Sequence, residues 1–296
     1  MNSETLGLVL RRAKKELLVI VENENAAECE ALLLVSHITG KTRAAIFATM
    51  QELVNEEQVA LLDKLLYERV ERRVPLQYLV GTVQFLDLEL MVRPPILIPR
   101  PETEEIVAWV IAHLQGLHTL PLRILDLCTG SGCIALALAQ AFPKAEVIGV
   151  DINPEAVVLA GENAIKNKVG NVRFLEGSLF DPLPEGYLCD LLIANPPYIA
   201  ENKYVGLQPE VKLWEDKRAL IADDNGMACY EAILAHAKLY IDKQSILVQQ
   251  KRFVLIVEIG IDQQEIGALF QAYGFSRWQL FYDMSNNLRW IAAQYE

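Results

Sequence analysis

From Arg123 to the end of the chain, strand-length apolar runs alternate with longer helical segments, and this alternation limits the fold more than any other feature. We expect strands at 123–127, 146–150, 172–176, 189–194, 253–259, 278–282 and 288–293, and helices at 133–142, 154–167, 226–240 and 263–272. Strands separated by helices pair in parallel and are covered on both faces. The sequence therefore predicts a doubly wound, Rossmann-like α/β domain with a mostly parallel sheet and an antiparallel C-terminal strand.

The segment before this domain has a different period. Residues 1–75 carry apolar side chains at helical spacing, and Asn55 with Gln58 fits a capping box, so we expect a small helical bundle. From Gln77 to Val92 the period changes to two, which predicts a hairpin. We expect three parts: a helical domain at 1–75, a β-hairpin linker at 76–100 and the α/β domain at 101–296.

Charge and cysteine content exclude several classes of protein. The net charge of −12 argues against a protein that binds nucleic acid by neutralising phosphates, and the cluster Arg69, Arg72 and Arg73 fits the C-terminal end of a helix. Five scattered cysteines without a C-x-x-C motif indicate a reducing compartment and no zinc or other metal site. The N-terminus lacks a signal-peptide pattern, and charges interrupt every apolar run, so we expect a cytoplasmic protein that does not enter a membrane.

The tetrapeptide Asn195-Pro196-Pro197-Tyr198 directly follows the apolar run 189–194. Ligands of open α/β sheets bind beyond the carboxyl ends of the strands, so all four residues are candidates for substrate binding. Asn195, Pro196 and Tyr198 are also candidates for catalysis, and Asn195 for cofactor binding. The Asn195 side-chain oxygen and the Pro196 carbonyl can accept both hydrogens of a planar NH2 group, Pro197 restricts the backbone, and Tyr198 offers an aromatic wall. Two fixed acceptors favour a pyramidal nitrogen whose lone pair faces an electrophile. We call this arrangement the amide clamp.

A second candidate site follows the first strand. Asp126 is followed by the glycine-rich turn Cys128-Thr129-Gly130-Ser131-Gly132, which opens a helix, and Asp151 ends the next strand. Such a turn binds an anion, and such a carboxylate accepts hydrogen bonds from ribose hydroxyls. The turn alone also fits a dinucleotide. The amide clamp distinguishes between the two cofactors, because methylation of an amide or amino nitrogen requires such a clamp and hydride transfer does not. S-adenosylmethionine is therefore the expected cofactor. Nicotinamide chemistry is a minor alternative.

These motifs together resemble class I methyltransferases that act on planar nitrogens, specifically the peptide chain release factor N5-glutamine methyltransferases. The resemblance covers the chain from about residue 75 onward, and the helical start agrees only in kind. It is carried by Pro75-Leu76-Gln77-Tyr78 with Gly81, Ile98-Pro99-Arg100-Pro101-Glu102-Thr103-Glu104, Asp126 to Gly132, Asn195 to Tyr198, and Glu258-Ile259-Gly260 with Gln263.

The resemblance implies a class I methyltransferase fold and methylation of the glutamine of the Gly-Gly-Gln motif in class I release factors. It implies that Asn195 and Pro196 hold the amide, that Cys128 to Gly132 and Asp151 hold S-adenosylmethionine, and that Ser178 and Leu179 flank its adenine. Arg100 to Thr103 would border the methyl-donor pocket. The helical domain at 1–75 would recognise the protein substrate.

The sequence departs from the family pattern at several places. Ser178 stands where the family often has Asp, and Leu288 replaces an expected acid. Segments 214–217, 223–226 and 242–252 also differ. We expect all of these except Ser178 to lie away from the two pockets.

Three alternatives remain open at this stage. A ribosomal-protein glutamine methyltransferase shares the clamp and the glycine-rich turn, but Pro101-Glu102-Thr103-Glu104 argues against it. An adenine-N6 DNA or RNA methyltransferase would need a basic groove that the acidic chain lacks. A non-catalytic binding module is disfavoured, because the clamp and Asp151 are both intact.

Overall fold

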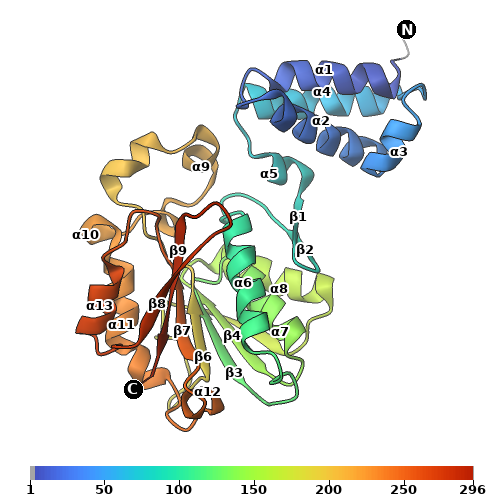
Figure 1. Ribbon diagram of the computed structural model, residues 1–296. Coiled ribbons are helices and arrows are strands. Elements are labelled where there is room, and N and C mark those ends of the chain that lie inside the picture. The colour runs from blue at the N-terminus through green and yellow to red at the C-terminus, as the bar shows by residue number, and fades with distance from the viewer. Residues whose placement is uncertain (1–3, 296) are drawn as a thin grey trace. The chain divides into compact units, whose positions relative to one another are not determined.

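In the computed structural model, which describes residues 4–295, the alternating segments form a seven-stranded sheet (Figure 1). The strand order is β5-β4-β3-β6-β7-β9-β8. Their bounds are β3 (Arg123–Leu127), β4 (Glu146–Asp151), β5 (Val172–Glu176), β6 (Leu191–Ala194), β7 (Phe253–Glu258), β8 (Trp278–Tyr282) and β9 (Leu288–Gln294). β3 to β7 pair in parallel, and β9 runs antiparallel to both of its neighbours. The predicted doubly wound, mostly parallel sheet is confirmed.

Helices cover both faces of this sheet, with α6, α7 and α8 on one face and α11 and α13 on the other (Figure 1). Their bounds are α6 (Pro101–His113), α7 (Cys133–Ala141), α8 (Pro154–Asn167), α11 (Ala228–Tyr240) and α13 (Ile266–Ala272). The four residues of β6 are all buried, because strands at the centre of such a sheet are covered on both sides. This explains why the strands appear in the sequence as continuous apolar runs.

The chain reverses direction across the sheet between β3 and β6. It proceeds outward from β3 to β4 and β5, and then returns to pair β6 on the opposite edge of β3. Ligands of doubly wound sheets bind at the carboxyl ends of the strands where this reversal occurs. Cys128 follows β3 and Asn195 follows β6, so the reversal brings both sequence-predicted sites to the same end of the sheet.

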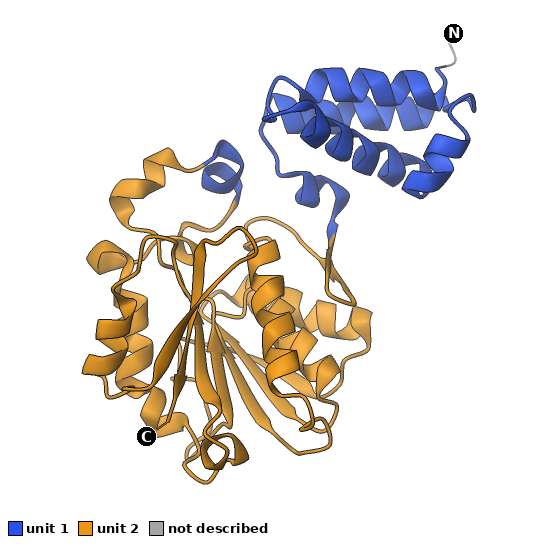
Figure 2. Cartoon of the chain, in the orientation of Figure 1, with its two compact units in different colours: residues 1–82, 208–214 blue, residues 83–207, 215–296 orange. Residues whose placement is uncertain are grey.

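The chain separates into two compact units, shown in blue and orange in Figure 2. Unit 1 is the described chain up to Thr82 together with Gln208–Trp214; unit 2 is Val83–Leu207 and the described chain from Glu215. Unit 1 contains α1 (Leu6–Leu17), α2 (Glu24–Thr39), α3 (Arg43–Ala48), α4 (Glu56–Val70), α5 (Leu76–Val80) and α9 (Pro209–Trp214). Residues 1–3, on which part of our signal-peptide argument rests, lie outside the described residues.

Local signals at the helix ends of unit 1 act as the sequence predicts. The Gln58 backbone N–H donates to Asn55 Oδ1 at 2.8 Å, and the Asn55 N–H donates to Gln58 Oε1 at 3.2 Å, which completes the capping box. Arg69 lies in the last turn of α4, where it is buried and pairs with Glu30 and Glu210. Glu210 belongs to α9, so ion pairs attach this short helix to the bundle.

Two secondary-structure predictions need correction. The hairpin begins later than expected, with β1 (Thr82–Phe85) and β2 (Leu88–Met91). Residues 76–80 form α5 because Pro75 starts a helical turn and Gly81, at φ +82°, ends it. Residues 199–225 have little periodicity in the sequence, which indicates a long loop, but they contain the short helices η1 (Glu201–Gly206), α9 and η2 (Lys217–Ala219). The element α10 (Asp223–Gly226) is a turn in which Asp224, Asn225 and Gly226 have positive φ, and α12 (Ile246–Gln249) lies in the segment 242–252. In residues 4–295 no helix has both the length and the apolar character needed to cross a bilayer.

Candidate functional site

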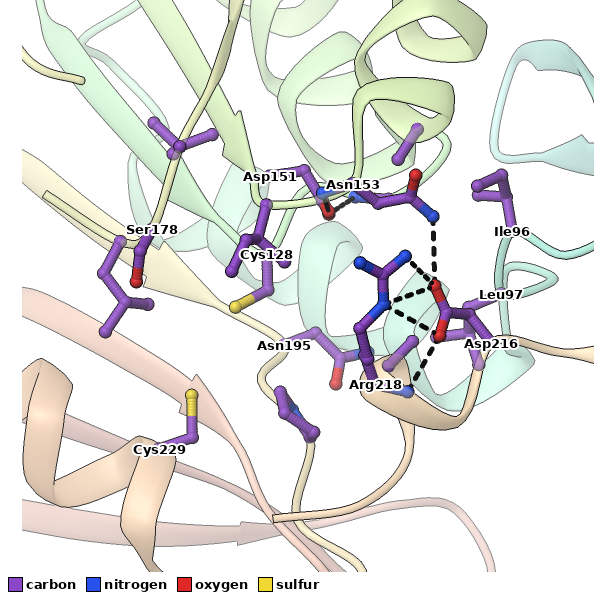
Figure 3. Close-up of a pocket in the computed structure, with 18 residues that line it drawn as sticks. Ile96, Leu97, Cys128, Asp151, Asn153, Ser178, Asn195, Asp216, Arg218 and Cys229 are labelled. Atoms are coloured by element: carbon purple, nitrogen blue, oxygen red, sulfur yellow. Dashed lines mark hydrogen bonds and ion pairs between the residues drawn. The ribbon is translucent and has the colours of Figure 1, made fainter. Parts of the chain in front are cut away.

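A cavity of about 300 Å³ lies in unit 2 beyond the carboxyl ends of β3, β4 and β6 (Figure 3). Seven sequence-predicted residues line it: Cys128, Gly130, Asp151, Ser178, Leu179, Asn195 and Pro197. The cavity thus brings together residues of the glycine-rich turn, Asp151 at the end of β4, the pair Ser178 and Leu179, and two residues of the tetrapeptide that follows β6. The other predicted residues, Thr129, Ser131, Gly132, Pro196 and Tyr198, are not among its lining residues.

The glycine-rich turn presents only part of itself to the cavity. Gly130 adopts φ +55°, and a Cβ there would meet no atom of the chain within 4 Å, so its backbone is open to a ligand. Gly132, at φ +82°, begins α7, and a Cβ there would come within 2.9 Å of the Ala160 Cβ. Thr129 is buried beneath the turn and donates from Oγ1 to Asp126 Oδ2 at 2.5 Å. Gly132 and Thr129 therefore support the turn.

Asp151 ties the turn to the end of β4. Its Oδ2 accepts from the Gly130 N–H at 2.8 Å, and its Oδ1 accepts from the Asn153 N–H at 2.9 Å. Burial raises the pKa of Asp151, and these backbone donors act in the opposite direction. Each carboxylate oxygen has a further lone pair, so the group can accept two more hydrogen bonds from a ligand in the cavity.

The amide clamp begins directly after the last residue of β6. Asn195 is half-buried and lines the cavity, and Pro196 behind it is buried. Asn195 Nδ2 donates to Thr103 Oγ1 at 3.2 Å. Tyr198 lines a neighbouring hollow, and its backbone carbonyl accepts from Gln263 Nε2 at 3.4 Å. None of residues 100–103 lines the cavity, although the resemblance placed them at its border; Thr103 reaches it through Asn195.

Sequence reasoning missed a charged wall of the cavity. Asp216 and Arg218 both line it and pair at 2.7 Å, and Asp216 Oδ2 also accepts from Asn153 Nδ2 at 3.1 Å (Figure 3). Neighbouring Glu215 is buried and pairs with Arg100. The cavity is completed by residues that sequence reasoning also missed, namely Ile96, Leu97, Val150, Ile152, Ala156, Gly177, Ala219 and Cys229.

The expectation that segments 214–217 and 223–226 lie away from the pockets is wrong. Asp216 lines the cavity, and Gly226 abuts the Tyr198 backbone, where a Cβ would lie 2.2 Å from the carbonyl oxygen. The sequence did contain one indication that these segments lie near the site: both belong to the stretch with little periodicity that directly follows the clamp.

Two domain families match the chain. Residues 9–81 match the PrmC N-terminal domain, and residues 120–254 match a methyltransferase domain. The catalytic domain of hMettl16, in a complex with the MAT2A 3'UTR hairpin 1, superposes with a TM-score of 0.52 at 14% identity, covering 82% of this chain and 83% of that one. At this identity the likeness shows the fold alone, and that fold is the class I methyltransferase fold.

Curated relatives extend the match over nearly the whole chain. The release factor glutamine methyltransferase of Aliivibrio fischeri is 32% identical over 294 residues, covering 99% of this chain and 98% of the relative. The enzyme of the same name from Geobacter sulfurreducens is 37% identical, with 86% and 84% covered. On this similarity the chain belongs to the release factor glutamine methyltransferase family.

Proposed function

We propose that this protein transfers a methyl group from S-adenosylmethionine to the side-chain amide nitrogen of the glutamine in the Gly-Gly-Gln motif of class I release factors. The observation that carries the proposal is the position of Asn195: the clamp begins at the wall of the same cavity that Asp151 and Gly130 line. The names of the curated relatives supply the substrate. The acidic charge of the chain supports a protein partner over nucleic acid, and we propose the cytoplasm as the place of action.

The cavity fits S-adenosylmethionine. The Asp151 carboxylate has lone pairs left for a ribose diol, and the open backbone at Gly130 leaves room for a ligand against the turn. Apolar side chains at Ile96, Leu97 and Leu179 suit the faces of an adenine ring. When bound, this cofactor supplies a methyl group on a positively charged sulfur.

The clamp residues prepare the nitrogen. Asn195 Oδ1 and the Pro196 carbonyl accept the two hydrogens of the substrate amide, which favours a pyramidal nitrogen whose lone pair is less delocalised into the carbonyl group. Tyr198 packs beside the amide. The clamp needs no general base, because a methylated and transiently cationic amide is a strong acid that releases its proton to an acceptor or to water. Positioning therefore carries the catalysis.

The function is tested with S-adenosylmethionine labelled in its methyl group and a purified class I release factor. We expect label in the peptide that contains Gly-Gly-Gln, and no label after its glutamine is replaced by alanine. Label that persists in that variant, or that appears only on a ribosomal protein or on nucleic acid offered in parallel, would contradict the proposal. Mass spectrometry of the digested substrate locates the methyl group.

Replacing Asp151 with alanine is expected to weaken cofactor binding strongly. The change removes the acceptors proposed for the ribose and the partner of the Gly130 N–H. Hydrogen bonds to a charged group contribute about 1.5–3 kcal/mol, which corresponds to a rise in Kd of roughly 10–150-fold. Calorimetric titration with S-adenosylhomocysteine measures this change in Kd. The matched control is Glu155→Ala, an exposed acid in the first turn of α8, which should leave Kd unchanged.

A further inference from the structure

We propose that Thr103 and Glu258 are positioning residues that fix the orientation of the Asn195 amide, so that its oxygen faces the cavity. The inference rests on the proposed function, because it assigns the clamp its acceptor. It concerns two residues outside the cavity lining, which reach the substrate only through Asn195.

The three side chains form a continuous chain of hydrogen bonds. Thr103 Oγ1 donates to Glu258 Oε2 at 2.7 Å, and Asn195 Nδ2 donates to Thr103 Oγ1 at 3.2 Å. Thr103 lies in the first turn of α6, and Glu258 is the last residue of β7, the neighbour of β6 in the sheet. Thr103 and Glu258 are 2% and 4% exposed, so water does not compete for these bonds.

The donors and acceptors allow one arrangement when Glu258 is ionised. A carboxylate only accepts, so the single hydroxyl proton of Thr103 is committed to Glu258. Thr103 can then only accept from Asn195, which must turn its NH2 group toward Thr103 and its oxygen the other way. Without Thr103 the amide can rotate by half a turn with little change of shape, and would then present NH2 to the NH2 group of the substrate.

Protonation of Glu258 reverses the direction of the hydrogen bonds that link Glu258, Thr103 and Asn195. Burial raises the pKa of Glu258 to about 7. The protonated carboxyl can donate to Thr103, whose own proton then points at the Asn195 amide and favours the rotated form. The titratable or charged groups whose charges interact with Glu258 are Glu102, Arg100, Arg289, Tyr198, Tyr230 and Cys133. Because the ionised form holds the productive orientation, methyl transfer should rise as pH increases through about 7.

The test compares Thr103→Val, which keeps the shape without the hydroxyl, with Thr103→Ser, which keeps the hydroxyl. We expect Thr103→Val to lower kcat by about tenfold to a hundredfold, in line with the loss of one hydrogen bond to a charged group, with KM for release factor and Kd for S-adenosylhomocysteine within about threefold. Thr103→Ser should restore most of kcat. In Glu258→Gln the rise of kcat near pH 7 should disappear, because a glutamine does not titrate.

A second readout does not depend on turnover. In protein labelled with ¹⁵N-asparagine, the side-chain NH2 signals of Asn195, assigned by their absence in Asn195→Ala, should shift with pH with a midpoint near 7 in the wild type. They should not shift in Thr103→Val, whose fold is checked by a cooperative thermal transition above the temperature of the measurement. The inference is overturned if Thr103→Val retains the kcat of the wild type. It is also overturned if kcat of Glu258→Gln still rises near pH 7. If the wild type methylates no release factor, the proposed function fails, and the NMR titration still decides the inference.

Discussion

Replacing Asn195 with alanine is expected to lower methyl transfer by about a hundredfold to a thousandfold while cofactor binding changes by less than about threefold. The side-chain oxygen is one of two fixed acceptors in the proposed clamp, and removing one preorganised group of this kind costs about 2.7–4 kcal/mol in comparable sites. Asn195 is half-buried at the wall of the cavity and not in the core of the sheet, so its loss should fall on kcat and leave the fold intact. Single-turnover assays with release factor measure the change.

The matched control is Asn202→Ala, an exposed asparagine in η1 of the loop that follows the clamp. It should retain full turnover. Asn195→Asp adds an independent check, because a carboxylate keeps two acceptors but cannot donate to Thr103 in its ionised form. Turnover of Asn195→Ala within threefold of the wild type would show that the nitrogen is activated elsewhere.

Local patterns in the sequence were sufficient for most of the fold. Every strand of the large sheet lies within two residues of its predicted start, because buried strands and amphipathic helices have distinct apolar periods. The corrected segment at 76–80 is too short to have a period of its own, and Pro75 and Gly81 decided it. The short helices in 199–225 were not predicted, because they too are too short to show a helical period.

The site was predictable where its residues adjoin strand ends and not where distant segments meet. Asp151 and Asn195 each follow directly from the alternation of strands and helices. The hydrogen bond between Thr103 and Glu258 joins residues 155 positions apart, and neither residue carries a mark of its partner in the sequence. Glu102 and Glu104 lie in the first turn of α6, where acids suit the helix dipole, and the sequence alone indicates no more than that. In the structure Glu102 pairs with Arg289 at 3.0 Å, and Glu104 accepts from the Leu86 N–H at 3.1 Å.

Gly226 is the position where we expect the second large effect, because it lies against the backbone of the clamp. It adopts φ +90°, a conformation that L side chains rarely take. A Cβ at this position would lie 2.2 Å from the Tyr198 carbonyl oxygen and 3.0 Å from its carbon. The neighbouring residue Ile199 is held on both sides: its N–H donates to the Leu220 carbonyl at 2.9 Å, and its carbonyl accepts from the Ala222 N–H at 3.0 Å. The backbone at Tyr198 therefore cannot move freely away from residue 226.

Gly226→Ala is therefore expected to displace the Tyr198 backbone and, with it, the clamp. A displacement near 1 Å can cost about a hundredfold in rate, so we expect kcat to fall by about that factor, together with roughly 1–3 kcal/mol of stability. Gly206→Ala, in the same loop and with no atom within 4 Å of its Cβ, should change neither. Thermal unfolding confirms that the variant is folded at the assay temperature, and binding of S-adenosylhomocysteine reports the cavity separately. If folded Gly226→Ala retained full kcat, the position of the Tyr198 backbone would not matter for the reaction, and positioning by the clamp could not carry the catalysis in the way we propose.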